Sequence, residues 1–136
     1  MRLMVYSDGG ARGNPGPAAA AFLILTEKGQ ILKKSSRCLG LRTNNQAEYE
    51  ALIAALESAV AFGAVEVICH LDSEVVTKHL TGEYKVKKEV LRGLWVRAQE
   101  LKKCFKAASF VHVPRTNRYI EEADRLVNEA LDKASV

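Results

Sequence analysis

Apolar residues recur along this chain in two spacings, one typical of strands and one typical of helices. Short apolar runs bounded by Gly, Pro, Asn or Asp predict strands, whereas apolar residues three and four positions apart predict helices. We therefore expect strands at 3–7, 18–26, 30–39, 65–71 and 109–113. Helices are expected at 44–62, from a cap at Ser73 to about Gly82, at 88–104 and at 120–133. The Gly- and Pro-rich segment from Gly9 to Pro17 is expected to be a loop.

Local signals support several of these boundaries. Thr43 and Gln46 have the spacing of a capping box at the start of a helix, and Gly63 can end that helix. Gly29 can supply the positive φ of a short hairpin loop between the second and third strands. The order of elements predicts an α/β fold with a mixed five-stranded sheet flanked by helices on both sides. We find no internal repeat and no linker, so residues 1–136 are expected to form a single domain.

Four acidic residues occupy positions where acids are unusual. Asp8 and Asp72 stand at the C-terminal ends of predicted strands, where open α/β sheets bind their ligands. Glu48 and Asp124 share the apolar stripes of their helices, so both side chains are predicted to point toward the sheet. The stripe residues are Leu52, Ala55, Ala59 and Phe62 for Glu48, and Ile120, Ala123, Val127 and Leu131 for Asp124.

A carboxylate that faces a core is costly unless it is paired or bound to a metal. Each acid has a separate structural explanation: Asp8 could begin a turn, Asp72 could cap a helix, and Asp124 could favour a helix N-terminus. A single divalent cation site explains all four at once, because carboxylate oxygens are preferred ligands of Mg²⁺ and Mn²⁺. We therefore expect these acids to form a metal site.

Four segments carry a family resemblance that covers nearly the whole chain. The segments YSDGGARGNPGP, TNNQAEYEAL, LDSEVV and EEADRLVNEAL resemble the four acidic motifs of type-1 ribonuclease H, in the same order. The resemblance implies the ribonuclease H-like fold and an endonuclease that hydrolyses the RNA strand of RNA–DNA hybrids, giving 5′-phosphate and 3′-hydroxyl ends. It also implies a two-metal mechanism in which Asp8, Glu48, Asp72 and Asp124 bind two Mg²⁺ ions, with Mn²⁺ as a substitute.

The same resemblance suggests a set of substrate contacts. Glycines allow the backbone to approach a ligand closely, and amide side chains suit the 2′-hydroxyls that distinguish RNA from DNA. Asn44 and Asn45 could instead serve only as first-turn helix residues. The expected substrate-binding residues are Gly9, Gly10, Arg12, Asn14, Asn44 and Asn45.

The chain departs from the family pattern near its last acid. Many members carry a His in the preceding loop, but none lies between Pro114 and Asp124. We expect Arg115 to take that role by stabilising phosphate charge, since arginine cannot act as a general base at neutral pH. Arg118 is the competing candidate, and His112 is expected to be a structural residue of its strand. Glu74 stands where the family often has Gln.

Composition and charge indicate which partners and which cellular location suit this protein. The formal net charge is +4, and basic residues gather between positions 85 and 106, which suits nucleic acid as well as an ordinary solvated helix face. Three widely spaced cysteines favour free thiols and a cytoplasmic location. We expect a monomer that binds RNA–DNA hybrids, with double-stranded RNA as a further ligand and no membrane association. The alternatives are a catalytically weak hybrid- or double-stranded-RNA-binding module of the same fold, another nuclease of this superfold, and a structural metal site.

Overall fold

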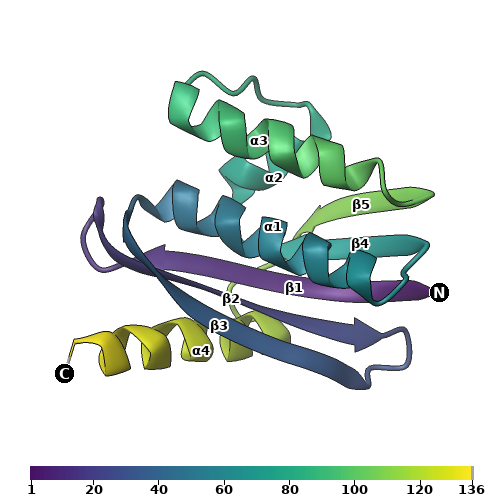
Figure 1. The fold of residues 1–136 in the computed structure, drawn as a ribbon, viewed down its shortest axis with the longest axis horizontal. Helices are drawn as coiled ribbons and strands as arrows, with labels where there is room; N and C mark the ends of the chain where they lie inside the picture. The colour runs from purple at the N-terminus through teal and green to yellow at the C-terminus, as the bar shows by residue number, and fades with distance from the viewer. Residues whose placement is uncertain (136) are drawn as a thin grey trace.

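A five-stranded sheet forms the centre of the computed structural model, which describes residues 1–135. Its strands are β1 (Arg2–Ala11), β2 (Gly16–Thr26), β3 (Ile31–Arg42), β4 (Glu66–Leu71) and β5 (Ala107–His112). The order across the sheet is β3-β2-β1-β4-β5. The first three strands form an antiparallel meander, whereas β4 is parallel to both β1 and β5 (Figure 1). The predicted mixed sheet is confirmed.

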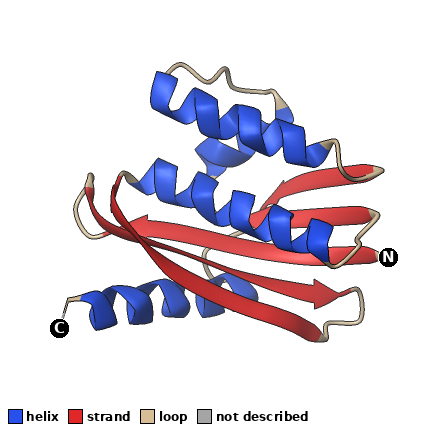
Figure 2. Ribbon diagram, viewed as in Figure 1, coloured by secondary structure: helices blue, strands red, loops and turns tan. Residues whose placement is uncertain are grey.

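Helices cover both faces of this sheet, as expected. They are α1 (Asn44–Ala61), α2 (Glu74–Thr81), α3 (Glu89–Lys102) and α4 (Arg118–Ala134). Figure 2 shows α1, α2 and α3 on one face and α4 alone on the other. Each face has its own apolar core, and α4 packs against β1, β2 and β3. The predicted order of strands and helices is therefore correct.

The predicted loop between Gly9 and Pro17 was too long. Strand β1 continues to Ala11 and β2 begins at Gly16, because Gly9–Ala11 pair in register with Ala18–Ala20. Only residues 12–15 connect the two strands. The backbone ladder therefore overrides the low strand propensity of the glycines.

Other local expectations hold. Thr43 and Gln46 form the predicted capping box, with reciprocal hydrogen bonds at the start of α1. Cys38, Cys69 and Cys104 are free thiols. Among residues 1–135, no helix is both long and apolar enough to cross a lipid bilayer.

Candidate active site

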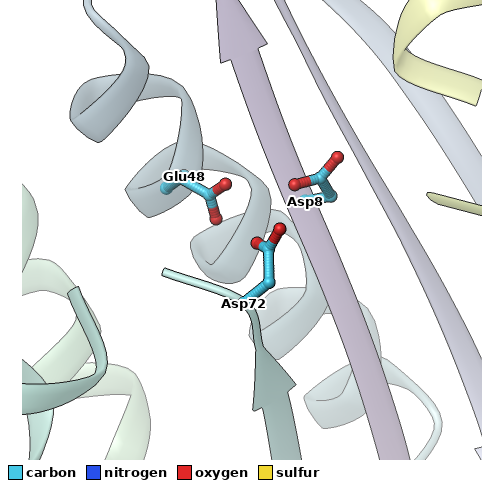
Figure 3. A group of neighbouring side chains, drawn as sticks. All are labelled: Asp8, Glu48 and Asp72. Carbon is cyan, nitrogen blue, oxygen red and sulfur yellow. The ribbon is translucent and has the colours of Figure 1, made fainter. Parts of the chain in front are cut away.

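Three acids from separate elements converge beside the carboxyl end of β4. Asp8 lies in β1, Glu48 lies in the first turns of α1, and Asp72 directly follows β4. One carboxylate oxygen of each lies within 4.8 Å of the others, and Figure 3 shows the three side chains pointing toward one another. Asp8 and Glu48 are 6% and 7% exposed, and the Asp72 side chain is 10% exposed. These three acids therefore lie together, as the sequence predicted.

Close packing of α1 on β1 brings Glu48 to Asp8. A Cβ atom on Gly9 would lie 2.2 Å from both the carbonyl carbon and the oxygen of Ala47, so only glycine permits this approach. The neighbouring Gly9 backbone N–H partly offsets the raised pKa of Glu48, because it favours the ionised form. Gly9 therefore allows Glu48 to lie beside Asp8 through its lack of a side chain.

The electrostatics of the three acids favour a bound cation. Burial and then the charge of Asp72 raise the pKa of Asp8 to about 7. Burial and then the charges of Asp8 and Asp72 raise the pKa of Glu48 well above its ordinary value. Among the described residues, Glu48 Oε2 is buried with no hydrogen-bond partner. An orphaned carboxylate oxygen beside two further carboxylates is the donor set that a hard divalent cation requires.

Asp124 reaches this group differently from the prediction. Its side chain was expected to point toward the sheet, but Asp124 is exposed, so that expectation was wrong. The buried stripe of α4 consists of Ile120, Ala123, Val127 and Leu131. Asp124 lies beside this stripe and lines the same cleft as the other acids, close enough to Asp8 to raise its pKa. The fourth acid is therefore near the other three acids but accessible to solvent.

An open cleft of about 380 Å³ surrounds the acids. Five of the six expected substrate-binding residues line it: Gly9, Gly10, Arg12, Asn44 and Asn45. Asn14 lies behind them, where its Oδ1 accepts a hydrogen bond of 3.0 Å from the Asn44 N–H. The Asn44 Oδ1 in turn accepts from the Ala11 N–H at 2.9 Å. Both amide oxygens are thus used internally, which leaves the amide nitrogens as the groups available to a ligand.

Arg12 is engaged by α4. Its Nη2 lies 2.7 Å from Asp132 Oδ1 and donates to Asn128 Oδ1 at 3.2 Å. Asn128 also donates to the Asp124 carboxylate from its Nδ2, at 3.4 Å. Asn128 was not among the residues predicted from the sequence, although its position four residues after Asp124 places both on neighbouring turns of one helix face.

Two side chains, one at the end of β5 and one in the segment that follows it, approach Asp72. The Arg115 Nε lies 3.6 Å from Asp72 Oδ2, on a side chain that is 89% exposed, and Arg115 lines the cleft. Arg118 instead stacks over the Tyr119 ring, 4.9 Å from its centroid. His112 belongs to β5 as expected, and its Nε2 donates to the Asp72 carbonyl oxygen at 3.1 Å. Of the two arginines considered, Arg115 is the one at the site.

The sequence is similar to a family model and to ribonuclease H proteins over nearly its whole length. A family model described as "Reverse transcriptase-like" matches residues 6–130. The chain is 47% identical over 133 residues to the ribonuclease HI of Halobacterium salinarum, covering 98% of this chain and 66% of that protein. It is 42% identical over 137 residues to a bifunctional protein of Mycobacterium tuberculosis, covering 99% of this chain and 37% of that protein. This chain therefore spans less than two thirds of either relative.

Solved structures agree with these sequence relatives. The crystal structure of the Halobacterium salinarum ribonuclease H1 superposes with a TM-score of 0.93 at 46% identity, covering 98% of this chain and 99% of the other. The LC11 ribonuclease H1, in complex with an RNA/DNA hybrid, superposes with a TM-score of 0.92 at 44% identity, covering 98% and 99% of the two chains. The chain belongs to the type-1 ribonuclease H family, within the reverse transcriptase-like group that the matching model describes. The resemblance predicted from the four acidic motifs is confirmed.

Proposed function

We propose that this protein is an endonuclease that hydrolyses the RNA strand of RNA–DNA hybrids and leaves 5′-phosphate and 3′-hydroxyl ends. The observation that carries the proposal is the convergence of Asp8, Glu48 and Asp72 within 4.8 Å, at an open cleft lined by amide side chains. Two relatives support the same activity: one is a ribonuclease HI, and the other is a ribonuclease H1 whose structure contains an RNA/DNA hybrid.

The four acids would hold two divalent cations, Mg²⁺ or in its place Mn²⁺. When bound, such a pair activates a water and stabilises the leaving oxygen of a phosphodiester. Asp8 is central because it faces Asp72 and Asp124 as well as Glu48. Asp124 completes the set from the solvent side, where a ligand can exchange without disturbing the core.

The substrate-facing residues would recognise the RNA strand. Asn44 and Asn45 lie in the first turn of α1 and line the cleft, and Asn14 supports Asn44 from behind. Amide nitrogens are suitable donors to 2′-hydroxyls and base edges in a minor groove. Gly10 also lines the cleft, where a Cβ would meet only the Val127 side chain, at the ordinary contact distance of 3.8 Å.

Arg115 would stabilise the negative charge of a substrate phosphate. Its exposed guanidinium beside Asp72 can contact a phosphate that approaches the acids. Arginine stays protonated at neutral pH, so Arg115 would stabilise phosphate charge or assist product release without transferring a proton. We further propose that the protein acts as a monomer in the cytoplasm and that double-stranded RNA is a second ligand.

The direct test is cleavage of labelled substrates by the purified protein. An RNA–DNA hybrid, duplex DNA, duplex RNA and single strands are incubated with and without Mg²⁺. We expect cleavage of the hybrid alone, only with Mg²⁺, and only in the RNA strand. Asp8→Asn should abolish cleavage while hybrid binding survives, because one ligand charge is lost at nearly constant shape. Hybrid binding in Ca²⁺ without cleavage in Mg²⁺ would indicate a binding module instead.

A further inference from the structure

A series of polar contacts links the connection between β1 and β2 to Asp124, the fourth acid. Arg12 donates from one nitrogen, Nη2, to the backbone oxygen and to the side-chain Oδ1 of Asn128, at 3.4 and 3.2 Å. The same nitrogen lies 2.7 Å from Asp132 Oδ1 on the next turn of α4. The guanidinium therefore bridges two turns of the helix that carries Asp124.

This contact fixes which way the Asn128 amide faces. A guanidinium has only donors, so the amide group of Asn128 must turn its oxygen toward Arg12. Its nitrogen then points toward Asp124, where it donates to the backbone oxygen at 3.0 Å and lies 3.4 Å from Oδ2. The reversed amide would place an oxygen against a carboxylate.

We propose that Asn128 is a positioning residue that holds the Asp124 carboxylate toward the metal site, with its amide oriented by Arg12. Asp124 is exposed and lacks the packing that orients Asp8 and Glu48, so a hydrogen bond is the available means of restricting its rotamer. Outer partners of this kind orient metal-binding carboxylates. The inference deepens the proposed function and rests on it.

Stability is not the main effect of this chain of contacts. The side chains of Arg12 and Asp132 are 44% and 69% exposed, and ion pairs at such positions contribute little to folding. Alanine is also a better helix former than asparagine, so Asn128→Ala should fold. The consequence of the substitution is expected at the site and not in the fold.

The test is a double-mutant cycle with two measurements. Asn128→Ala should weaken Mn²⁺ binding to the metal-free protein, measured by calorimetry, and lower turnover on a hybrid by on the order of tenfold. The KM for the hybrid should change by less than about twofold. In an Asp124→Asn background the same substitution should change Mn²⁺ affinity by less than about twofold, because its target is gone. Glu129→Ala, one residue further along α4, is the matched control and should leave both measurements unchanged.

Two results would overturn the inference in distinguishable ways. Equal effects of Asn128→Ala with and without Asp124 would show that Asn128 acts independently of this acid, while the proposed function would stand. A chain without substitutions that failed to cleave hybrids would overturn the proposed function, and this inference with it.

Discussion

At the scale of single residues, the environment of Asp8 dominates the chemistry of the site. The residue is 6% exposed, and three further acids surround its carboxylate. Burial and like charge both penalise ionisation, so in the absence of cations the folded protein retains protons that an unfolded chain would release. A bound cation reverses the penalty, since it replaces repulsion by attraction to each carboxylate. Cation binding at these few oxygens would therefore stabilise the folded state.

This coupling predicts how stability depends on pH. The folded-state pKa of Asp8 is about 7 against an ordinary value of 3.8, and the pKa of Glu48 moves in the same direction. A raised acid pKa means that the stability present below about pH 4 is lost as the pH rises toward 7. The melting temperature of the metal-free protein should therefore fall between about pH 4 and 7, measured by circular dichroism.

The controls for that experiment are a substitution and a cation. Asp8→Asn should flatten the pH dependence, since an amide does not titrate. At pH values above 7, saturating Mg²⁺ should raise the melting temperature, because a ligand of the folded state stabilises it by mass action. A metal-free melting temperature that rose steadily with pH across this range would contradict the assignment of a crowded acidic site.

The missing loop histidine leads to a second prediction at the residue scale. Arg115→Ala should lower single-turnover cleavage on the order of tenfold, less than the loss expected for a buried donor, because the side chain is largely exposed. Arg115→Lys should recover part of the loss, since a point charge replaces a planar fork. The ratio of variant to parent rates should be constant from about pH 6 to 9, because no proton is transferred.

Arg118→Ala is the matched control, because Arg118 stacks on Tyr119 away from the acids. Its cleavage rate should equal that of the parent. Loss of activity in His112→Ala, together with silent arginine variants, would place the loop function on the imidazole that binds the Asp72 carbonyl instead.

The sequence predicted some of these residues better than others, for physical reasons. Glu48 was found because a buried acid interrupts an apolar helical stripe, and burial is what such a stripe reports. Asp124 was predicted to be buried for the same reason but is exposed, because an apolar stripe in the sequence does not show which residues lie at its edge. The engagement of Arg12 by Asn128 and Asp132 joins segments more than a hundred positions apart, and no local pattern encodes it.

At the scale of elements, the site depends on the separation of α1 and β1. The capping box at Thr43 sets where α1 begins, and Gly9 sets how close it can come. The neighbouring Gly10 faces the other side of the sheet, where a Cβ would meet only the Val127 side chain. The two adjacent glycine positions thus differ in whether they can accept a side chain, because successive strand residues point to opposite faces of the sheet.

Alanine substitutions at these two positions should therefore differ. Gly9→Ala forces α1 away from β1 and is expected to lower the free energy of unfolding by about 3 kcal/mol, with loss of cleavage. Gly10→Ala should cost less than about 1 kcal/mol, since 3.8 Å is an ordinary contact distance. Urea unfolding of both variants gives the comparison, and equal destabilisation would show that the approach of α1 is not limited by Gly9.

Element types were predictable, but two features of their arrangement were not. Apolar runs and caps gave every strand and helix in the correct order. The glycine-rich start of the chain concealed the pairing of Gly9–Ala11 with β2, because strand pairing depends on a partner and not on composition. The placement of β4 next to β1, which brings Asp72 to Asp8, is likewise a long-range property.

At the scale of the whole molecule, charge is distributed unevenly around the cleft. Basic residues gather in the segment before α3 and along that helix, including Lys85, Lys87, Lys88, Arg92, Lys102 and Lys103. Helix α4, on the other side of the sheet, has more exposed acids than exposed bases: Glu121, Asp124, Glu129 and Asp132 against Arg118, Arg125 and Lys133. Figure 1 shows the N-terminal end of α3 at the same end of the molecule as the carboxyl end of β1. A nucleic acid that reaches the acids could therefore extend along the basic side.

This asymmetry predicts a specific salt dependence of hybrid binding. Each lysine that neutralises a phosphate contributes about 0.9 to the slope of log affinity against log salt concentration in duplex DNA. Lys87 and Lys88 are exposed at the start of α3, so the double variant Lys87→Gln/Lys88→Gln should lower that slope by roughly 2. Fluorescence anisotropy with a labelled hybrid, in Ca²⁺ to prevent cleavage, measures it across a salt series.

A variant with the same change in net charge separates local contact from long-range attraction. Lys28 and Lys33 lie on the β2–β3 hairpin, and Lys33 is directed to Ser58 on α1 by a 3.1 Å hydrogen bond. Lys28→Gln/Lys33→Gln should leave the slope unchanged, because counterions are released only where phosphates are contacted. Equal slopes in all three proteins would place the hybrid away from α3, whereas equal losses in both variants would mean that net charge alone determines the affinity.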